Sequence, residues 1–116
     1  MATPDPDGTG GGAVNELTDV TCTSLASCWA VGEFGTISNN AGVIVNLALH
    51  WNGRTWSLVR TPDPSGLADG DSNFLNGIRC ASAASCWAVG YGAPAGQANR
   101  NQALHWNGTR WTTGLR

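Results

Sequence analysis

The chain has 116 residues, a length typical of one small domain. Only 12% of the residues are charged, whereas 16 are glycine, six are tryptophan and four are cysteine, a balance that argues against disorder. The net charge of −2 and the six basic residues, all arginine, exclude nucleic-acid binding through a basic surface. No apolar run approaches the roughly 18 residues of a membrane helix, and the start lacks the pattern of a signal peptide, so we expect no membrane partner and no export signal.

Two copies of one unit make up nearly the whole chain. Between positions 3–32 and 61–90, 17 of 30 residues are identical, and between positions 46–56 and 101–111, 8 of 11 are identical. This self-similarity indicates a tandem duplication, which we divide into units 1–60 and 61–116.

Each unit is expected to form four short β-strands. Val, Ile, Trp and Cys are enriched in segments that Gly, Pro and Asn separate, and no segment keeps a helical spacing. The Asn52-Gly53 and Asn107-Gly108 pairs are typical of a two-residue type I′ turn between the third and fourth strands. The expected strands are 17–22, 28–34, 43–51 and 56–60 in the first unit, and 75–80, 86–91, 102–106 and 111–115 in the second.

Several expected strands, such as 29–31 and 43–45, are apolar on both faces, so their sheets should be covered on both sides. Four antiparallel strands per repeat, stacked face to face around an axis, form a β-propeller. The predicted fold is therefore all-β, with two four-stranded antiparallel propeller blades. Small residues are expected where the blades converge, namely Ala30, Gly32, Ala48, Ala88, Gly90 and Ala103.

The order of a hydrophobic strand, Cys-Trp-Ala-Val-Gly, His-Trp-Asn-Gly and a closing Trp resembles the Trp-rich repeats of secreted actinobacterial propeller proteins. Segments 32–37 and 53–56 are also similar to the Asp-box blades of sialidases. Trp51 and Trp106 stand where that motif has its Asp, and the sialidase Arg triad and Tyr–Glu pair have no match. The resemblance therefore implies the propeller fold without sialidase chemistry.

The cysteines are Cys22, Cys28, Cys80 and Cys86, and four cysteines permit three pairings. Repeat symmetry favours the two local disulfides, Cys22 with Cys28 and Cys80 with Cys86. A zinc site is the alternative, although the spacing lacks the close Cys pair of common zinc modules, so we predict no metal. Disulfides imply an oxidising compartment, which suggests an excised or engineered piece of a secreted, extracellular protein.

The residues considered for ligand binding recur with the repeat. Catalysis normally needs one asymmetric site, whereas repetition usually reports packing, so we expect each His to be hydrogen-bonded near the end of the third strand. No matched carboxylate pair for glycoside hydrolysis is present, and we predict no enzyme, no catalytic residue and no cofactor. Sugar stacking on an exposed Trp is the alternative to packing. The residues concerned are Trp51, Trp106, His50, His105, Asn52 and Asn107.

Segment 69–73 (Asp-Gly-Asp-Ser-Asn) alternates oxygen-bearing residues as a calcium loop does. It lacks the distal Glu of an EF-hand, and its copy at 11–15 has no acidic residue. A solvated linker is the favoured interpretation.

Two blades cannot close a propeller, because each repeat needs neighbours on both sides to bury its faces. We therefore expect identical chains to associate head to tail. Four chains and eight blades are favoured, with a trimer or pentamer as alternatives. The predicted function is a non-catalytic, self-assembling propeller scaffold; the alternative is a multivalent carbohydrate-binding, lectin-like propeller.

Overall fold

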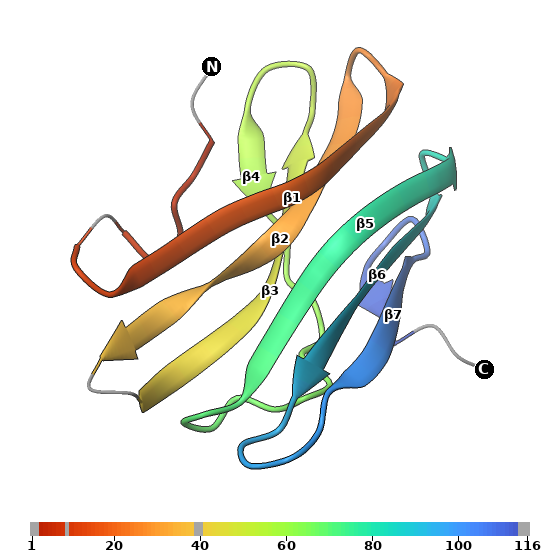
Figure 1. Ribbon diagram of the computed structural model, residues 1–116. Coiled ribbons are helices and arrows are strands. Elements are labelled where there is room, and N and C mark those ends of the chain that lie inside the picture. Colours follow the sequence, from red (N-terminus) through yellow and green to blue (C-terminus); the bar gives the residue numbers. More distant parts are fainter. Residues whose placement is uncertain (1–2, 9, 39–40, 114–116) are drawn as a thin grey trace.

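The computed structural model describes residues 3–8, 10–38 and 41–113. This part of the chain is all-β, with eight strands and no helix (Figure 1). It accordingly has no helix long and apolar enough to cross a membrane. The strands are β1 (Ala13–Ser24), β2 (Ser27–Ser38), β3 (Ala41–Trp51), β4 (Trp56–Leu58), β5 (Ser72–Ser82), β6 (Ser85–Ala93), β7 (Arg100–Trp106) and β8 (Trp111–Thr112).

Consecutive strands pair antiparallel within each unit, from β1 to β4 and from β5 to β8. All eight expected strands are present. The first three of each unit extend beyond their predicted bounds, since strand pairing continues through small and polar residues past the apolar segments. The fourth strands are shorter than predicted, and the end of segment 111–115 lies outside the described residues.

A parallel bridge between Ile44 and Ser72 joins the two units into one open, mixed sheet. It forms because β4 covers only the last three residues of β3, which leaves the rest of that edge free. The connector returns along this edge, where the Ile44 amide donates to the Asp71 carbonyl at 3.1 Å. The expectation of purely antiparallel sheets is therefore wrong at this one junction.

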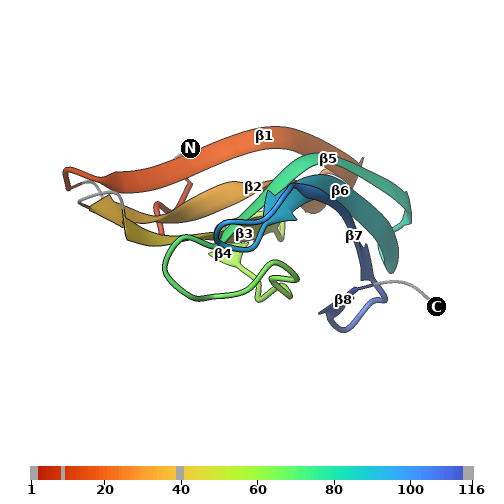
Figure 2. The ribbon, with the colours of Figure 1, turned by 60° about the horizontal axis from the view of Figure 1, so that its bottom comes forward.

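The second unit packs beside the first, so that β5 contacts β1, β2 and β3, and the molecule is arched (Figure 2). A cluster of buried residues fills the space between the units, and we call it the junction core. It consists of Trp29, Val31 and Ala48 from the first unit and Leu75, Ile78, Cys86, Ala88, Leu104 and Trp111 from the second. A smaller outer cluster contains Ala30, Leu47 and Leu49, with Phe34 and Trp56 packed against it.

Gly32 and Gly90 are required by strand pairing. A Cβ atom at Gly32 would lie 1.9 Å from the Glu16 carbonyl oxygen, and one at Gly90 would lie 1.9 Å from the Phe74 carbonyl oxygen. Both glycines lie at the shifts in register of their own hairpins, and the expectation that they serve blade convergence stays a prediction. Of the alanines, Ala48 and Ala88 lie in the junction core, Ala30 lies in the outer cluster and Ala103 is half-buried.

The β3–β4 hairpin differs from the predicted two-residue turn. Trp51 pairs with Trp56, so four residues form the loop. The Asn52 side-chain oxygen accepts hydrogen bonds from the amides of Arg54 and Thr55, both at 2.9 Å. This side-chain cap replaces the backbone turn that the Asn-Gly pair predicted, and Asn107 does the same in the second unit.

Candidate functional site

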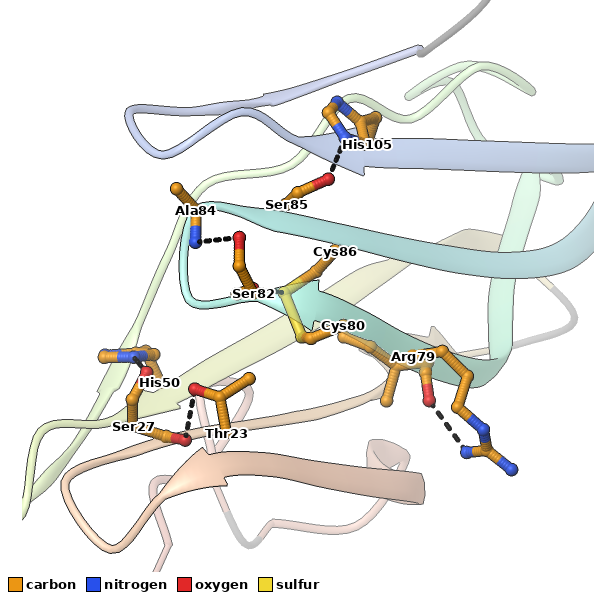
Figure 3. The surroundings of a disulfide bond; sticks show 11 residues. Thr23, Ser27, His50, Arg79, Cys80, Ser82, Ala84, Ser85, Cys86 and His105 are labelled. Carbon is orange, nitrogen blue, oxygen red and sulfur yellow. Dashed lines mark hydrogen bonds between the residues drawn. A yellow bond between two sulfur atoms is a disulfide. The ribbon is translucent and has the colours of Figure 1, made fainter.

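Both local disulfides are present in the structure, and Figure 3 shows the surroundings of the one between Cys80 and Cys86. Cys22 pairs with Cys28 across the β1–β2 hairpin, and Cys80 pairs with Cys86 across the β5–β6 hairpin. In each hairpin the two cysteines are direct register partners near the turn. Two such bonds are compatible with an extracellular protein.

The two histidines are held in the same way in both units. Ser27 Oγ lies 3.1 Å from His50 Nε2, and Ser85 Oγ lies 3.1 Å from His105 Nε2 (Figure 3). Burial lowers the pKa of His50, since it disfavours the charged imidazolium. These hydrogen bonds agree with the packing role expected for both histidines.

The other residues considered for ligand binding also make structural contacts. Trp51 donates its indole N–H to the Leu25 carbonyl at 3.1 Å, and Asn52 and Asn107 cap their loops. His50 and Trp106 share a groove of about 300 Å³ between the units, together with Ser27 and Ser57. The structure does not gather the six residues into one site, and carbohydrate binding stays a prediction.

The interpretation of segment 69–73 as a solvated linker is wrong for two of its residues, because Asp71 and Asn73 are buried. Their side-chain oxygens accept hydrogen bonds from backbone amides and so stabilise the folded connector. The donors are Ala68 and Ala95 for Asp71, and Ser65 for Asn73. Among the described residues, no group of three His, Cys, Asp or Glu side chains is placed to hold a metal ion.

A pair of carboxyl groups that sequence reasoning missed lies on β1 and β2. Glu16 and Glu33 are register partners, and Glu33 is only 7% exposed. Burial raises the pKa of Glu33 to about 7, aided by the charge of Glu16 and a hydrogen bond to it. The signal was a break in the repeat: the matching positions hold Phe74 and Tyr91, whose rings stack at 4.9 Å.

The second unit exposes residues whose first-unit counterparts are buried. Trp29 is 3% exposed and Val31 is fully buried in the junction core, whereas Trp87 and Val89 at the matching positions are 42% and 49% exposed. Tyr91, on the same side of β6, is 37% exposed. We call the surface formed by Trp87, Val89 and Tyr91 the trailing face.

The first unit, in turn, exposes residues whose second-unit counterparts are buried. The surface that receives Trp29 and Val31 contains Leu75, Ile78, Ala88 and Trp111, all of them at most 4% exposed. The matching residues of the first unit, Leu17, Val20, Ala30 and Trp56, line an open groove of about 430 Å³ together with Thr18 and Asp19. Leu17 is 39% and Val20 is 55% exposed. We call this groove the leading face.

Polar contacts give the junction between the units a defined register. The Asp19 carboxylate accepts a hydrogen bond from the Ile78 amide at 2.9 Å and lies 3.8 Å from the Arg79 guanidinium. Asn46 and Gln102 exchange two side-chain amide hydrogen bonds, at 2.9 and 3.0 Å. The junction is thus a mated surface, of which the leading and trailing faces are unmated copies.

No protein-family model, curated protein or solved structure matches this chain.

Proposed function

We propose that this chain is a non-catalytic, self-assembling β-propeller fragment, whose two-unit chains dock head to tail into a closed ring. The trailing face of one chain covers the leading face of the next, as the first unit covers the second within the chain. The observation that carries the proposal is the contrast in exposure between matched residues, such as 3% for Trp29 against 42% for Trp87.

The energetics favour such docking. Burial of apolar surface contributes roughly 25 cal/mol per Å² before the entropy of association is subtracted. Both faces place several large apolar side chains side by side, a pattern that marks interaction sites on soluble proteins. Water leaves these faces when they meet.

The geometry favours a ring over a two-fold dimer. The two faces differ from each other, so their contact is heterologous, and repetition of one rotation builds a row that closes if the rotation divides the circle. Closed rings of four-stranded sheets form propellers, most often of about four to eight blades, and a ring of five two-blade chains would exceed this common range. Four chains with eight blades are the favoured assembly, and three or five chains are the alternatives.

A non-catalytic role accords with the chemistry of the site. The histidines recur and are engaged by serines, and Glu33 is buried. The two disulfides support an extracellular setting for the parent protein.

The assembly is tested by light scattering on the full chain at micromolar concentration. We expect a mass of three to five chains, with four favoured. Val20→Arg places a charge in the leading face and should give monomers, since an unpaired charge is costly to bury. Leu67→Arg is the matched control, because Leu67 is 67% exposed and lies on the connector, outside both faces. A monomeric wild-type chain, or a Val20→Arg variant that assembles normally, contradicts the proposal.

A further inference from the structure

We infer that Trp87 of one chain seats against Trp51 and Trp56 of a second copy, as Trp29 seats against Trp106 and Trp111 within the chain. This inference rests on the proposed head-to-tail assembly and names the residues that hold it together. It assigns one occupant to the leading face, the trailing face of the same protein.

The internal junction supplies the template. The Trp29 ring lies 4.9 Å from Trp106 and 5.1 Å from Trp111, measured between ring centroids. The two receiving rings are 5.9 Å apart and inclined by 52°. Trp29 is thereby almost wholly removed from water, at 3% exposure.

The receiving pair already exists at the leading face, since Trp56 lines that groove and Trp51 packs against Trp56. Trp51 and Trp56 lie 5.7 Å apart and are inclined by 48°, nearly the arrangement of Trp106 and Trp111. They are register partners on β3 and β4, and the Trp51 indole is anchored to the Leu25 carbonyl. Little rearrangement is needed before a third ring can bind, which lowers the entropic cost of association.

The inserting ring is also held in place. Trp87 packs on His105 at 4.5 Å and 44°, as Trp29 packs on His50 at 4.6 Å and 53°. Ser85 holds His105 by the hydrogen bond that Ser27 makes to His50. The two halves of a tryptophan cluster are thus preformed on opposite ends of the same molecule.

The junction between chains should depend more on this cluster than the internal junction does. In the junction between chains, Gly77 of one chain stands at the position of Asp19, and Thr21 of the next chain stands at the position of Arg79. No copy of the Asp19–Arg79 ion pair can therefore form there. Leu47 of the next chain stands at the position of Gln102, so the two side-chain hydrogen bonds between Asn46 and Gln102 have no counterpart between chains. Aromatic and apolar contact is what remains, and a central Trp in such a contact is the usual hot spot.

The test is a mixing experiment. Trp87→Ala removes the inserting ring and leaves the leading face intact, while Trp56→Ala removes one receiving ring and leaves the trailing face intact. Each variant alone should associate at least about 30-fold more weakly than wild type, the usual effect of losing a hot-spot residue. Mixed in equal amounts, the two should form a complex of two chains, because one intact pair of faces is restored.

Val20→Arg takes the place of Trp56→Ala if that variant does not give the wild-type circular dichroism spectrum. Leu67→Ala is the control for loss of an exposed apolar side chain, and it should assemble as wild type. If wild type forms rings and Trp87→Ala forms them equally well, the inference is overturned while the proposed function stands. Trp56→Ala could also form dimers by itself, and addition of Trp87→Ala could leave their mass unchanged. That result would indicate a two-fold packing of Trp87 on Trp87, and it would also overturn the inference. A monomeric wild type overturns both.

Discussion

At the scale of single residues, Glu33 makes the stability of the first unit depend on pH. Its carboxyl group is buried beside Glu16, and one of its oxygens, Oε1, has no hydrogen-bond partner among the described residues. A buried carboxylate without full compensation costs stability, whereas the protonated acid is tolerated. The second unit avoids this cost, because stacked rings of Phe74 and Tyr91 occupy the matching positions.

The first prediction is a loss of stability as pH rises from about 4.5 to about 7. Glu33 has a pKa of about 7 when folded and 4.5 as the reference, so within this window the folded state holds a proton that the unfolded state has released. The free energy of unfolding should fall by an amount on the order of 2 kcal/mol across the window. Urea unfolding of wild type and Glu33→Gln at several pH values measures it.

Glu33→Gln should remove this fall. In this variant a weaker dependence of opposite sign should remain, and His50 should cause it. Because the pKa of folded His50 is lowered, the free energy of unfolding should increase as the pH rises toward 6.5. Glu16→Gln, which removes the neighbouring charge, should shrink the fall without abolishing it. Equal pH dependence in wild type and Glu33→Gln would refute the assignment.

At the scale of elements, each disulfide closes one hairpin and crosses no junction. The cysteines of each pair are six positions apart in sequence, on β1 and β2 or on β5 and β6. So short a loop restricts the unfolded chain only modestly, by roughly 2 kcal/mol. The contacts between units come from the side chains of the junction core, which include Cys86 of the second disulfide, and from the Asp19 and Asn46 hydrogen bonds.

The second prediction is that reduction lowers the melting temperature and leaves the mass of the assembly unchanged. Loss of about 2 kcal/mol per hairpin destabilises each unit, but neither open face includes a disulfide. Thermal melts and light scattering with and without reductant test this. The variant with all four cysteines replaced by serine is the control for effects of the reductant itself. Dissociation to monomers on reduction would show that the disulfides act on the junctions.

At the scale of the whole molecule, the chain has one mated junction and two unmated faces. The mated junction contains Trp29, Val31 and Ala48 against the second unit, with polar pairs around them. The proposed docking of chains would bury the remaining pair of faces, so the stability of a unit becomes tied to the concentration of its neighbours.

The third prediction follows from mass action. A protein stabilised by association melts at a higher temperature as its concentration rises, whereas an isolated monomer does not. The melting temperature of wild type should therefore increase between about 1 and 100 times the dissociation constant, where linkage reaches ~2.7 kcal/mol. Val20→Arg should melt at one temperature throughout, and Leu67→Arg should follow wild type. A wild-type melting temperature independent of concentration would argue against self-association.

Much of the candidate site could be predicted from the sequence, because the sequence patterns involved are local or repeated. The duplication predicted both disulfides, since Cys22–Cys28 and Cys80–Cys86 repeat the same spacing. It also predicted hydrogen-bonded histidines, because a residue that recurs in every repeat usually has a packing role. Glu33 was missed because its neighbour Glu16 is 17 positions away in the sequence and only strand pairing brings the two together.

The sequence alone determined the all-β class, the two units and the approximate place of all eight strands, because these depend on apolar patterning and on residues that end strands. Only the tertiary structure decided the parallel bridge from Ile44 to Ser72, the buried state of Asp71 and Asn73, and the four-residue loops. Identical residues also have different surroundings: Trp29 is buried and Trp87 is exposed. Whether a residue is buried depends on the surface that packs against it as much as on the residue itself. For Trp29 the second unit supplies that surface.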